Sequence, residues 1–261
     1  MLKDITFKPF PNNEYPFNIN CIKKLKKLDL SNPITVFVGD NGSGKSTLLK
    51  AIAYYNDSIN VSSQSIDSNY YIDSVDLAKH MKCSYDVKTK KGFFFSGEEF
   101  ITYINHIKHM KQDLRDDLAR IEVEYKNRST FARNQARMAP AGQLSALEHS
   151  YDGDLKEKSH GEGFISFFKE RMHQKGLYLL DEPETPLSPI NQYKLVVMIT
   201  DLVKSGSQVI IATHSPIIMA LKGATIYQFG DEIDQVNYED IESVNFMRYF
   251  LNNKDSYIDR I

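Results

Sequence analysis

The sequence has few cysteines, no excess of charge and no long apolar run. Its 261 residues include only two cysteines, Cys21 and Cys83, which excludes a disulfide framework and a four-thiolate zinc site. Lysine and arginine number 32 against 34 acidic residues, so no overall positive charge draws the chain to nucleic acid or anionic lipid. No run reaches the roughly 18 apolar residues of a membrane span, and the N-terminus lacks a signal-peptide core. A cytoplasmic globular protein with no integral membrane segment is therefore expected.

Short apolar runs alternate with helix-like segments at both ends of the chain. The expected strands are 34–38, 177–180, 208–212 and 225–229, and the expected helices are 45–55, 191–204 and 216–221. This alternation is typical of a mostly parallel central sheet flanked by helices. The predicted fold class is α/β.

The middle of the chain has a different pattern. Residues 97–128 are charged, free of proline and carry apolar residues at helical spacing, which predicts an amphipathic helix. Residues 136–153 contain Pro140 and Gly142 and are expected to form a looser return connection. The expected division is an N-terminal lobe (1–56), an inserted helical arm or lid (57–155) and a C-terminal lobe (156–261).

A phosphate-binding loop is predicted at residues 39–47, which read GDNGSGKST and match G-x-x-x-x-G-K-[ST] between a strand and a helix. The glycines let backbone amides cradle phosphate oxygens at a helix N-terminus. Lys45 is expected to reach the β- and γ-phosphates, and the Ser46 hydroxyl to bind Mg²⁺. A turn that binds nothing is the disfavoured alternative, but kinases, GTPases and motor ATPases all share this loop. The expected nucleotide-binding residues are Gly39, Asp40, Asn41, Gly42, Ser43, Gly44, Lys45, Ser46 and Thr47.

Two further strand ends carry candidate catalytic groups. The run LYLLDE ends in Asp181 and Glu182, at the sheet edge where ligands of parallel sheets bind. Asp181 is expected to hold Mg²⁺, and Glu182 to act as general base on the attacking water. The run 208–212 leads to His214, which can contact the γ-phosphate. The alternatives are a solvated acidic turn and a packing histidine.

The phosphate loop, DEPETPLS at 181–188 and THSP at 213–216 together resemble the motifs of ABC-class ATPases. More narrowly, nearly the whole chain resembles small stand-alone bacterial predicted ATPases, the AAA family ATPases similar to the RecF/SMC-type group. This resemblance implies a P-loop NTPase with an ABC-ATPase-like head, ATP and Mg²⁺ as cofactors, and a homodimer that forms around ATP.

The resemblance also implies a signature of the form S-G-G-Q/E, which completes the site of the opposite subunit. SHGEG at 159–163 stands at the expected place, with His160 instead of the first glycine. Ser159, Gly161 and Glu162 are therefore candidates for contacting the partner's ATP, with a helix cap as the alternative. Residues 185–189 are expected to face the partner. The family's glutamine loop is not obvious, and Glu98 is a candidate replacement.

Two assignments remain open in the sequence. Tyr15 and Phe17 precede the phosphate-loop strand and are candidates for stacking on adenine, although aromatic residues at such places are more often core. A stretch without acids near the end of the expected arm helix can grip DNA, or can be a solvated loop beside its acidic neighbours. Its basic residues are Lys126, Arg128, Arg133 and Arg137.

The expected activity is ATP hydrolysis, with Glu182, His214 and Lys45 as catalytic residues. The resemblance favours a role in DNA maintenance or phage defence, with DNA or an effector protein as partner. One alternative is an ATP-dependent switch that controls an effector. The other is the nucleotide-binding subunit of a transporter, which is disfavoured because a signature starting Leu-Ser-Gly-Gly is not evident.

Overall fold

The computed structural model describes residues 1–11, 13–61, 72–150 and 160–258. Its central sheet has six strands in the order β5-β6-β7-β3-β8-β9, and only β9 is antiparallel to its neighbour. This arrangement confirms the predicted α/β class with a mostly parallel sheet. The strands are β5 (Gly92–Ser96), β6 (Leu177–Asp181), β7 (Gln208–Ala212), β3 (Ile34–Gly39), β8 (Thr225–Phe229) and β9 (Ile233–Val236).

A second, antiparallel sheet of three strands shares a hydrophobic core with the helix that follows the phosphate loop. It has the order β2-β1-β4, with β1 at Leu2–Phe7, β2 at Lys27–Asp29 and β4 at Met81–Tyr85. The buried Gln208 side chain at the start of β7 donates to the carbonyls of Leu2 and Leu30 and accepts from the Leu2 amide. This amide therefore joins the two sheets without leaving its own polar atoms unpaired. The helices that pack into the same core are α1 (Asn20–Lys24), α2 (Lys45–Tyr55) and α3 (Ile72–Lys79).

The other face of the central sheet is covered by α6 (His160–Arg171), α7 (Pro189–Lys204) and α8 (Pro216–Met219). Strands β6 and β7 are buried along their whole length, because a parallel sheet is covered by helices on both faces. Between β5, α4 and α6 the core is aromatic. It contains Phe93, Phe95, Phe100, Phe164, Phe167 and Phe168.

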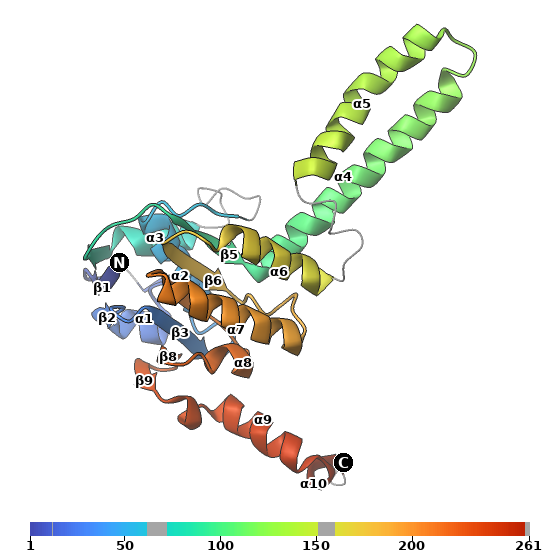
Figure 1. The fold of residues 1–261 in the computed structure, drawn as a ribbon. Helices are drawn as coiled ribbons and strands as arrows, with labels where there is room; N and C mark the ends of the chain where they lie inside the picture. The colour runs from blue at the N-terminus through green and yellow to red at the C-terminus, as the bar shows by residue number, and fades with distance from the viewer. Residues whose placement is uncertain (12, 62–71, 151–159, 259–261) are drawn as a thin grey trace.

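The inserted arm is a helical hairpin that projects away from the sheet (Figure 1). It consists of α4 (Gly97–Glu124) and α5 (Thr130–Ser150). The long amphipathic helix was predicted, but the expectation of a looser connection is wrong for 136–150, and 151–153 lie outside the described residues. Helix α5 continues through Pro140 because alanines favour the helix and because α5 packs along α4, with Arg115 pairing with Glu148 at 3.0 Å.

The chain continues beyond β9 into a short 3-10 turn (Tyr238–Asp240), α9 (Glu242–Asn252) and α10 (Lys254–Ile258). These helices extend below the sheet, on the side opposite to the arm in the view of Figure 1. In the part of the chain that the structure describes, no helix combines the length and apolar character needed to cross a membrane.

Candidate active site

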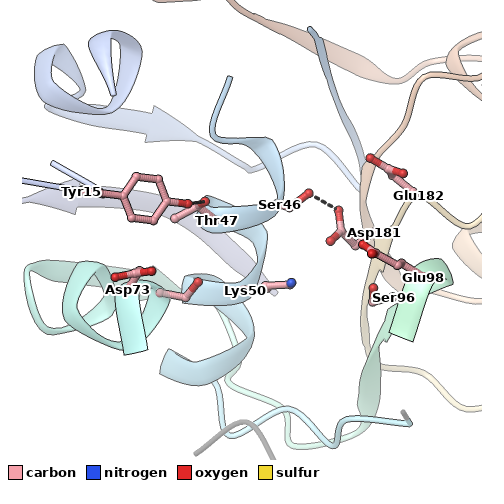
Figure 2. Close-up of a pocket in the computed structure, with 10 residues that line it drawn as sticks. Tyr15, Ser46, Thr47, Lys50, Asp73, Ser96, Glu98, Asp181 and Glu182 are labelled. Atoms are coloured by element: carbon pink, nitrogen blue, oxygen red, sulfur yellow. Dashed lines mark hydrogen bonds between the residues drawn. The ribbon is translucent and has the colours of Figure 1, made fainter. Parts of the chain in front are cut away.

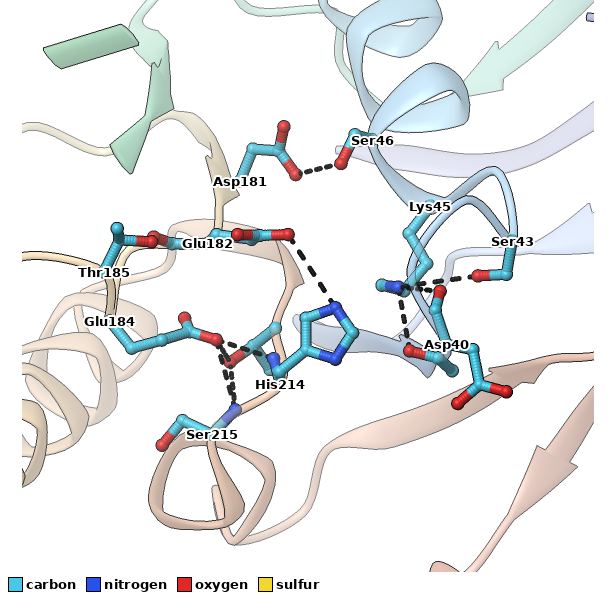
Figure 3. Close-up of polar contacts among 12 residues, drawn as sticks. Asp40, Ser43, Lys45, Ser46, Asp181, Glu182, Glu184, Thr185, His214 and Ser215 are labelled. Carbon is cyan, nitrogen blue, oxygen red and sulfur yellow. Dashed lines mark hydrogen bonds and ion pairs between the residues drawn. The ribbon is translucent and has the colours of Figure 1, made fainter. Parts of the chain in front are cut away.

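Three neighbouring strands bring the predicted motifs to one edge of the sheet (Figure 3). Strand β3 leads into the phosphate loop, β6 ends at Asp181, and β7 leads to His214. All three strands are parallel, and β7 lies between the other two. Their carboxyl ends therefore face the same side, which is where ligands bind in such sheets.

The phosphate loop has the backbone that its glycines predict. Gly39, Gly42 and Gly44 have φ values of 139°, 76° and 99°. Residues other than glycine rarely adopt such positive φ values. At Gly39 a Cβ atom would also lie 2.4 Å from the carbonyl oxygen of Phe229 on the neighbouring strand. The loop ends where α2 begins at Lys45, so the positive end of the helix dipole points at the loop.

Lys45 lies across this loop. Its Nζ atom donates to the carbonyl oxygens of Gly39 and Asp40 at 2.9 and 2.8 Å, and more weakly to the Ser43 hydroxyl at 3.4 Å. Burial lowers the pKa of Lys45, while Glu182 and Asp181 act in the opposite direction. The cation is thus held at the site where the loop amides and phosphate oxygens would meet.

Ser46 and Asp181 form the candidate Mg²⁺ site. The Ser46 hydroxyl donates to Oδ1 of Asp181 at 2.8 Å (Figure 3). Asp181 is only 4% exposed, and burial raises its pKa to about 7, with Lys50 and the Ser46 hydrogen bond opposing the shift.

This donor set fits Mg²⁺, which prefers oxygen ligands and normally takes one or two carboxylates, with water and phosphate oxygens completing its shell. The buried carboxyl also gains a counter-charge from the ion. Within the described residues no group of three or more His, Cys, Asp or Glu side chains could hold a metal ion on its own. The Ser46–Asp181 pair offers one hydroxyl and one carboxylate and leaves the rest of the shell of such an ion to water and phosphate oxygens.

Glu182 and His214 face each other across the same edge. Their Oε1 and Nε2 atoms are 3.7 Å apart, and the side chains are 41% and 38% exposed, so both remain accessible from the phosphate-loop side. Glu182 has a positive φ of 45°, which is uncommon outside glycine and marks a constrained position. A carboxylate and an imidazole at this spacing are placed to contact one water molecule and one phosphate oxygen.

Glu184 is a site residue that the sequence analysis missed. Its Oε1 atom accepts hydrogen bonds from the Thr213 hydroxyl at 2.7 Å and from the amides of His214 and Ser215 at 2.6 and 3.1 Å. Burial raises the pKa of Glu184, and the bonds from Thr213 and His214 oppose the shift. Glu184 therefore fixes the backbone that carries His214. The only sequence signal was the second glutamate of the motif that begins at Asp181.

A cavity of about 330 Å³ opens beside the metal site (Figure 2). The Tyr15 hydroxyl bonds to the Thr47 hydroxyl at 2.9 Å, so this exposed ring stands next to the helix that follows the phosphate loop. Phe17 instead is buried against Phe10 and His80, as a core residue. The cavity is lined by Tyr15, Ser46, Thr47, Lys50, Asp73, Ser74, Ser96, Glu98, Asp181 and Glu182.

The first turn of the arm helix also reaches this cavity. Glu98 lines it, whereas Glu99 is buried and pairs with Lys50 of α2 at 3.3 Å. Ser96 caps α4 by accepting from the Glu99 amide at 3.5 Å. The sequence analysis gave Glu98 as the candidate for the glutamine loop but gave Glu99 and Lys50 no role.

The structure describes only part of the predicted signature, whereas it shows contacts for two residues of the predicted basic stretch. Ser159 lies outside the described residues, and Gly161 and Glu162 belong to the first turn of α6. On the arm, Arg133 and Arg137 both pair with Glu122, at 3.7 and 2.6 Å. Half of the predicted basic stretch is therefore paired within the hairpin.

Comparison with known proteins gives matches to two family models and to a curated ATP-binding protein. The sequence model of a family described as AAA ATPase domain matches residues 96–219, and that of a family described as AAA domain matches residues 17–136. The maltose/maltodextrin import ATP-binding protein MalK of Aliivibrio fischeri (strain ATCC 700601 / ES114) is 27% identical over 233 residues, covering 83% of this chain and 57% of that protein. The chain thus spans little more than half the length of this curated relative.

The solved structures that match this chain include SMC head domains and an ATP-binding cassette of an ABC transporter. The Smc head domain from Pyrococcus furiosus, bound to the C-terminal domain of ScpA, has a TM-score of 0.46 at 11% identity, covering 95% of this chain and 99% of that one. An ATP-binding cassette of an ABC transporter in its ADP conformation has a TM-score of 0.46 at 14% identity, with the same coverage of 95% and 99%. The SMC head domain from Thermotoga maritima has a TM-score of 0.41 at 14% identity, covering 90% and 98%.

The two family models together span residues 17–219, which include the phosphate loop, the Asp181–Glu182 strand end and His214. Over these residues the chain is similar to the two ATPase family models, and the order of the strands brings their motifs to one edge of the sheet.

Proposed function

We propose that the chain hydrolyses ATP with Mg²⁺ in a composite site formed by two copies of itself, and that hydrolysis drives a conformational change. The observation that carries the proposal is the meeting of three groups at one sheet edge: the loop lysine Lys45, the Ser46–Asp181 pair and the Glu182–His214 pair. In this proposal residues 1–56 and 156–261 form the two lobes of the ATPase and residues 57–155 carry the arm, with β4 and β5 of this insertion adding a strand to each sheet.

The roles follow from the contacts. The amides of residues 39–47 and the Lys45 ammonium bind the phosphates, and Ser46 and Asp181 hold Mg²⁺, which when bound neutralises charge on the transferred phosphoryl group. Glu182 accepts a proton from the attacking water. His214, held by Glu184 through its backbone, donates to the γ-phosphate.

The second copy would complete the site. Ser159, Gly161 and Glu162 stand at or before the N-terminus of α6, where backbone amides and the helix dipole favour an anion. Residues 185–189 end the turn between β6 and α7, with Pro189 as the first residue of α7, and would face the partner. ATP bound between two copies then holds them together, and loss of the γ-phosphate lets them part.

The test is Glu182→Gln. Because the amide cannot take up the proton, we expect turnover to fall by about 10²–10⁴-fold, with an ATP-bound dimer that persists in size-exclusion chromatography with light scattering. Glu242→Gln is the matched control, since Glu242 is exposed in the first turn of α9 and belongs to none of the three groups that carry the proposal. Unchanged turnover in Glu182→Gln, or ATP that leaves the protein monomeric, would contradict the proposal.

DNA maintenance or phage defence in the cytoplasm is the process we propose, with the arm as the part that meets DNA. Its tip exposes Lys126 and Arg128, and the Arg128 guanidinium lies 5.5 Å from the centre of the Tyr125 ring. Both cysteines are free thiols, as suits a reducing compartment.

A second candidate function is an ATP-dependent switch for an effector protein. The transporter subunit is the third, and the import protein that is 27% identical is the observation in its favour. Co-purification from the native host separates the three, because DNA, an effector and a membrane permease are different companions.

A further inference from the structure

The first residue of the arm helix lies against the peptide of the proposed general base. A Cβ atom at Gly97 would stand 2.2 Å from the carbonyl oxygen of Glu182 and 3.3 Å from Cβ of Thr185. Strand pairing causes this approach, because Ser96 at the end of β5 is in register with Asp181 at the end of β6. Position 97 therefore needs glycine for space, whereas Gly39 of the phosphate loop needs it both for space and for its backbone angle.

The same carbonyl is held by Thr185. Its oxygen accepts from the Thr185 amide at 3.2 Å and from the Thr185 hydroxyl at 3.0 Å. The Glu182 amide donates to the carbonyl of Ala212 on β7 at 2.8 Å. The peptide of Glu182 is thus fixed from three directions, and this fixation maintains its positive φ of 45°.

The arm helix is anchored where it makes this contact. Glu99, two residues beyond Gly97, forms a buried pair with Lys50 of the phosphate-loop helix at 3.3 Å. Helix α4 then runs without interruption to Glu124. A displacement at the base of α4 is therefore transmitted to the carbonyl of Glu182 through direct backbone contact, with no flexible side chain between them to absorb it.

From these contacts we infer that Gly97 and Thr185 are positioning residues for Glu182. Gly97 lets the base of the arm pack on the Glu182 peptide, Thr185 binds the same carbonyl from the partner-facing turn, and together they aim the carboxylate at the attacking water. The inference rests on the proposed role of Glu182. Both the arm and the partner-facing turn would then influence the position of the same catalytic carboxylate.

The size of the effect follows from the geometry. Real Cβ atoms essentially never approach another atom within 3.0 Å, so alanine at position 97 must displace the Glu182 peptide or the base of α4 by roughly 0.8 Å or more. A misplacement of about 1 Å in a reacting geometry costs up to about 10²-fold in rate. We expect Gly97→Ala to lower kcat by about 10- to 100-fold. ATP affinity should stay within about twofold, because residues 39–47 are not touched.

The experiment measures kcat and KM for ATP, together with the Kd of a fluorescent ATP analogue, for matched variants. Gly142→Ala is the control for Gly97→Ala, since a Cβ at Gly142 meets nothing within 4 Å. Thr185→Val removes the hydroxyl donor and keeps the shape, so we expect kcat to fall severalfold. Thr185→Ser keeps the hydroxyl and should recover most of that loss.

The outcomes separate this inference from the proposed function. If Glu182→Gln leaves turnover intact, the proposed function fails. If Glu182→Gln abolishes turnover while Gly97→Ala and Thr185→Val keep wild-type kcat, only the positioning role is overturned. Equal losses in Thr185→Ser and Thr185→Val, or a fall in ATP affinity that accounts for the lower rate, would also overturn it. Should Gly97→Ala fail to fold, the Thr185 pair decides the question.

Discussion

Replacing the buried carboxyl of Asp181 by an amide should stabilise the nucleotide-free protein at neutral and alkaline pH. Asp181 is 4% exposed and accepts a hydrogen bond from Ser46, and an asparagine oxygen can accept the same bond. What Asp181→Asn removes is the cost of holding a negative charge in this site. The same change removes the proposed metal ligand, so stability and ATP turnover should move in opposite directions.

The magnitude follows from the pKa of Asp181, which burial raises from 3.8 to about 7. Between these two values the folded state binds a proton that the unfolded state has released, so the free energy of unfolding falls as the pH rises through this window. At about 1.36 kcal/mol per pH unit, the loss is on the order of 4 kcal/mol above pH 7. The asparagine variant does not have this loss. Its advantage over wild type should be near zero at about pH 4 and on the order of 4 kcal/mol at about pH 8.

The assay is urea unfolding at a series of pH values in EDTA, without nucleotide. Asp201→Asn is the matched control, because Asp201 is 69% exposed in its surface pair with Lys204 and such pairs contribute little. An Asp181→Asn variant that is no more stable than wild type at pH 8, or equally more stable at pH 4 and pH 8, would refute the reasoning.

Two further predictions concern Glu184, which holds the backbone at His214, and the arm. Glu184→Ala leaves the Thr213 hydroxyl and the amides of His214 and Ser215 without their shared acceptor, which costs about 1–3 kcal/mol for each buried group that stays unpaired. The free energy of unfolding, measured in urea, and kcat should therefore both fall. Glu184→Gln keeps an oxygen at this place and should retain most of the stability. If the arm binds DNA, the double change Lys126→Glu and Arg128→Glu should lower affinity for all sequences and reduce the salt slope by about two; an unchanged slope in a fluorescence-anisotropy titration would exclude the tip as the contact.

Strand ends were predictable because local signals agree there. The phosphate-loop motif sets the start of α2 at Lys45, and the apolar run 208–212 coincides with β7. In both places a short pattern, its turn residues and the chain direction indicate the same element. The assignment of Ser159, Gly161 and Glu162 to a signature stays a prediction.

Features that depend on partners far along the chain were missed. Pro140 is a strong local signal against a helix, yet α5 packs on α4 and continues through it. The pairing of Arg133 and Arg137 with Glu122 needs the hairpin to be formed first. Likewise, Gly97 contacts Glu182 only because β5 is the neighbour of β6, and a single sequence contains no signal for strand order.

The place of β7 between β3 and β6 sets the distance between the ends of these two strands. Neighbouring strands lie about 4.8 Å apart, so one intervening strand sets the end of β3 and the end of β6 about 10 Å apart. Since this spacing is made by backbone hydrogen bonds, side-chain substitutions at the site leave it in place. In the proposed function it sets the distance between the groups that bind phosphate and the groups that bind the attacking water.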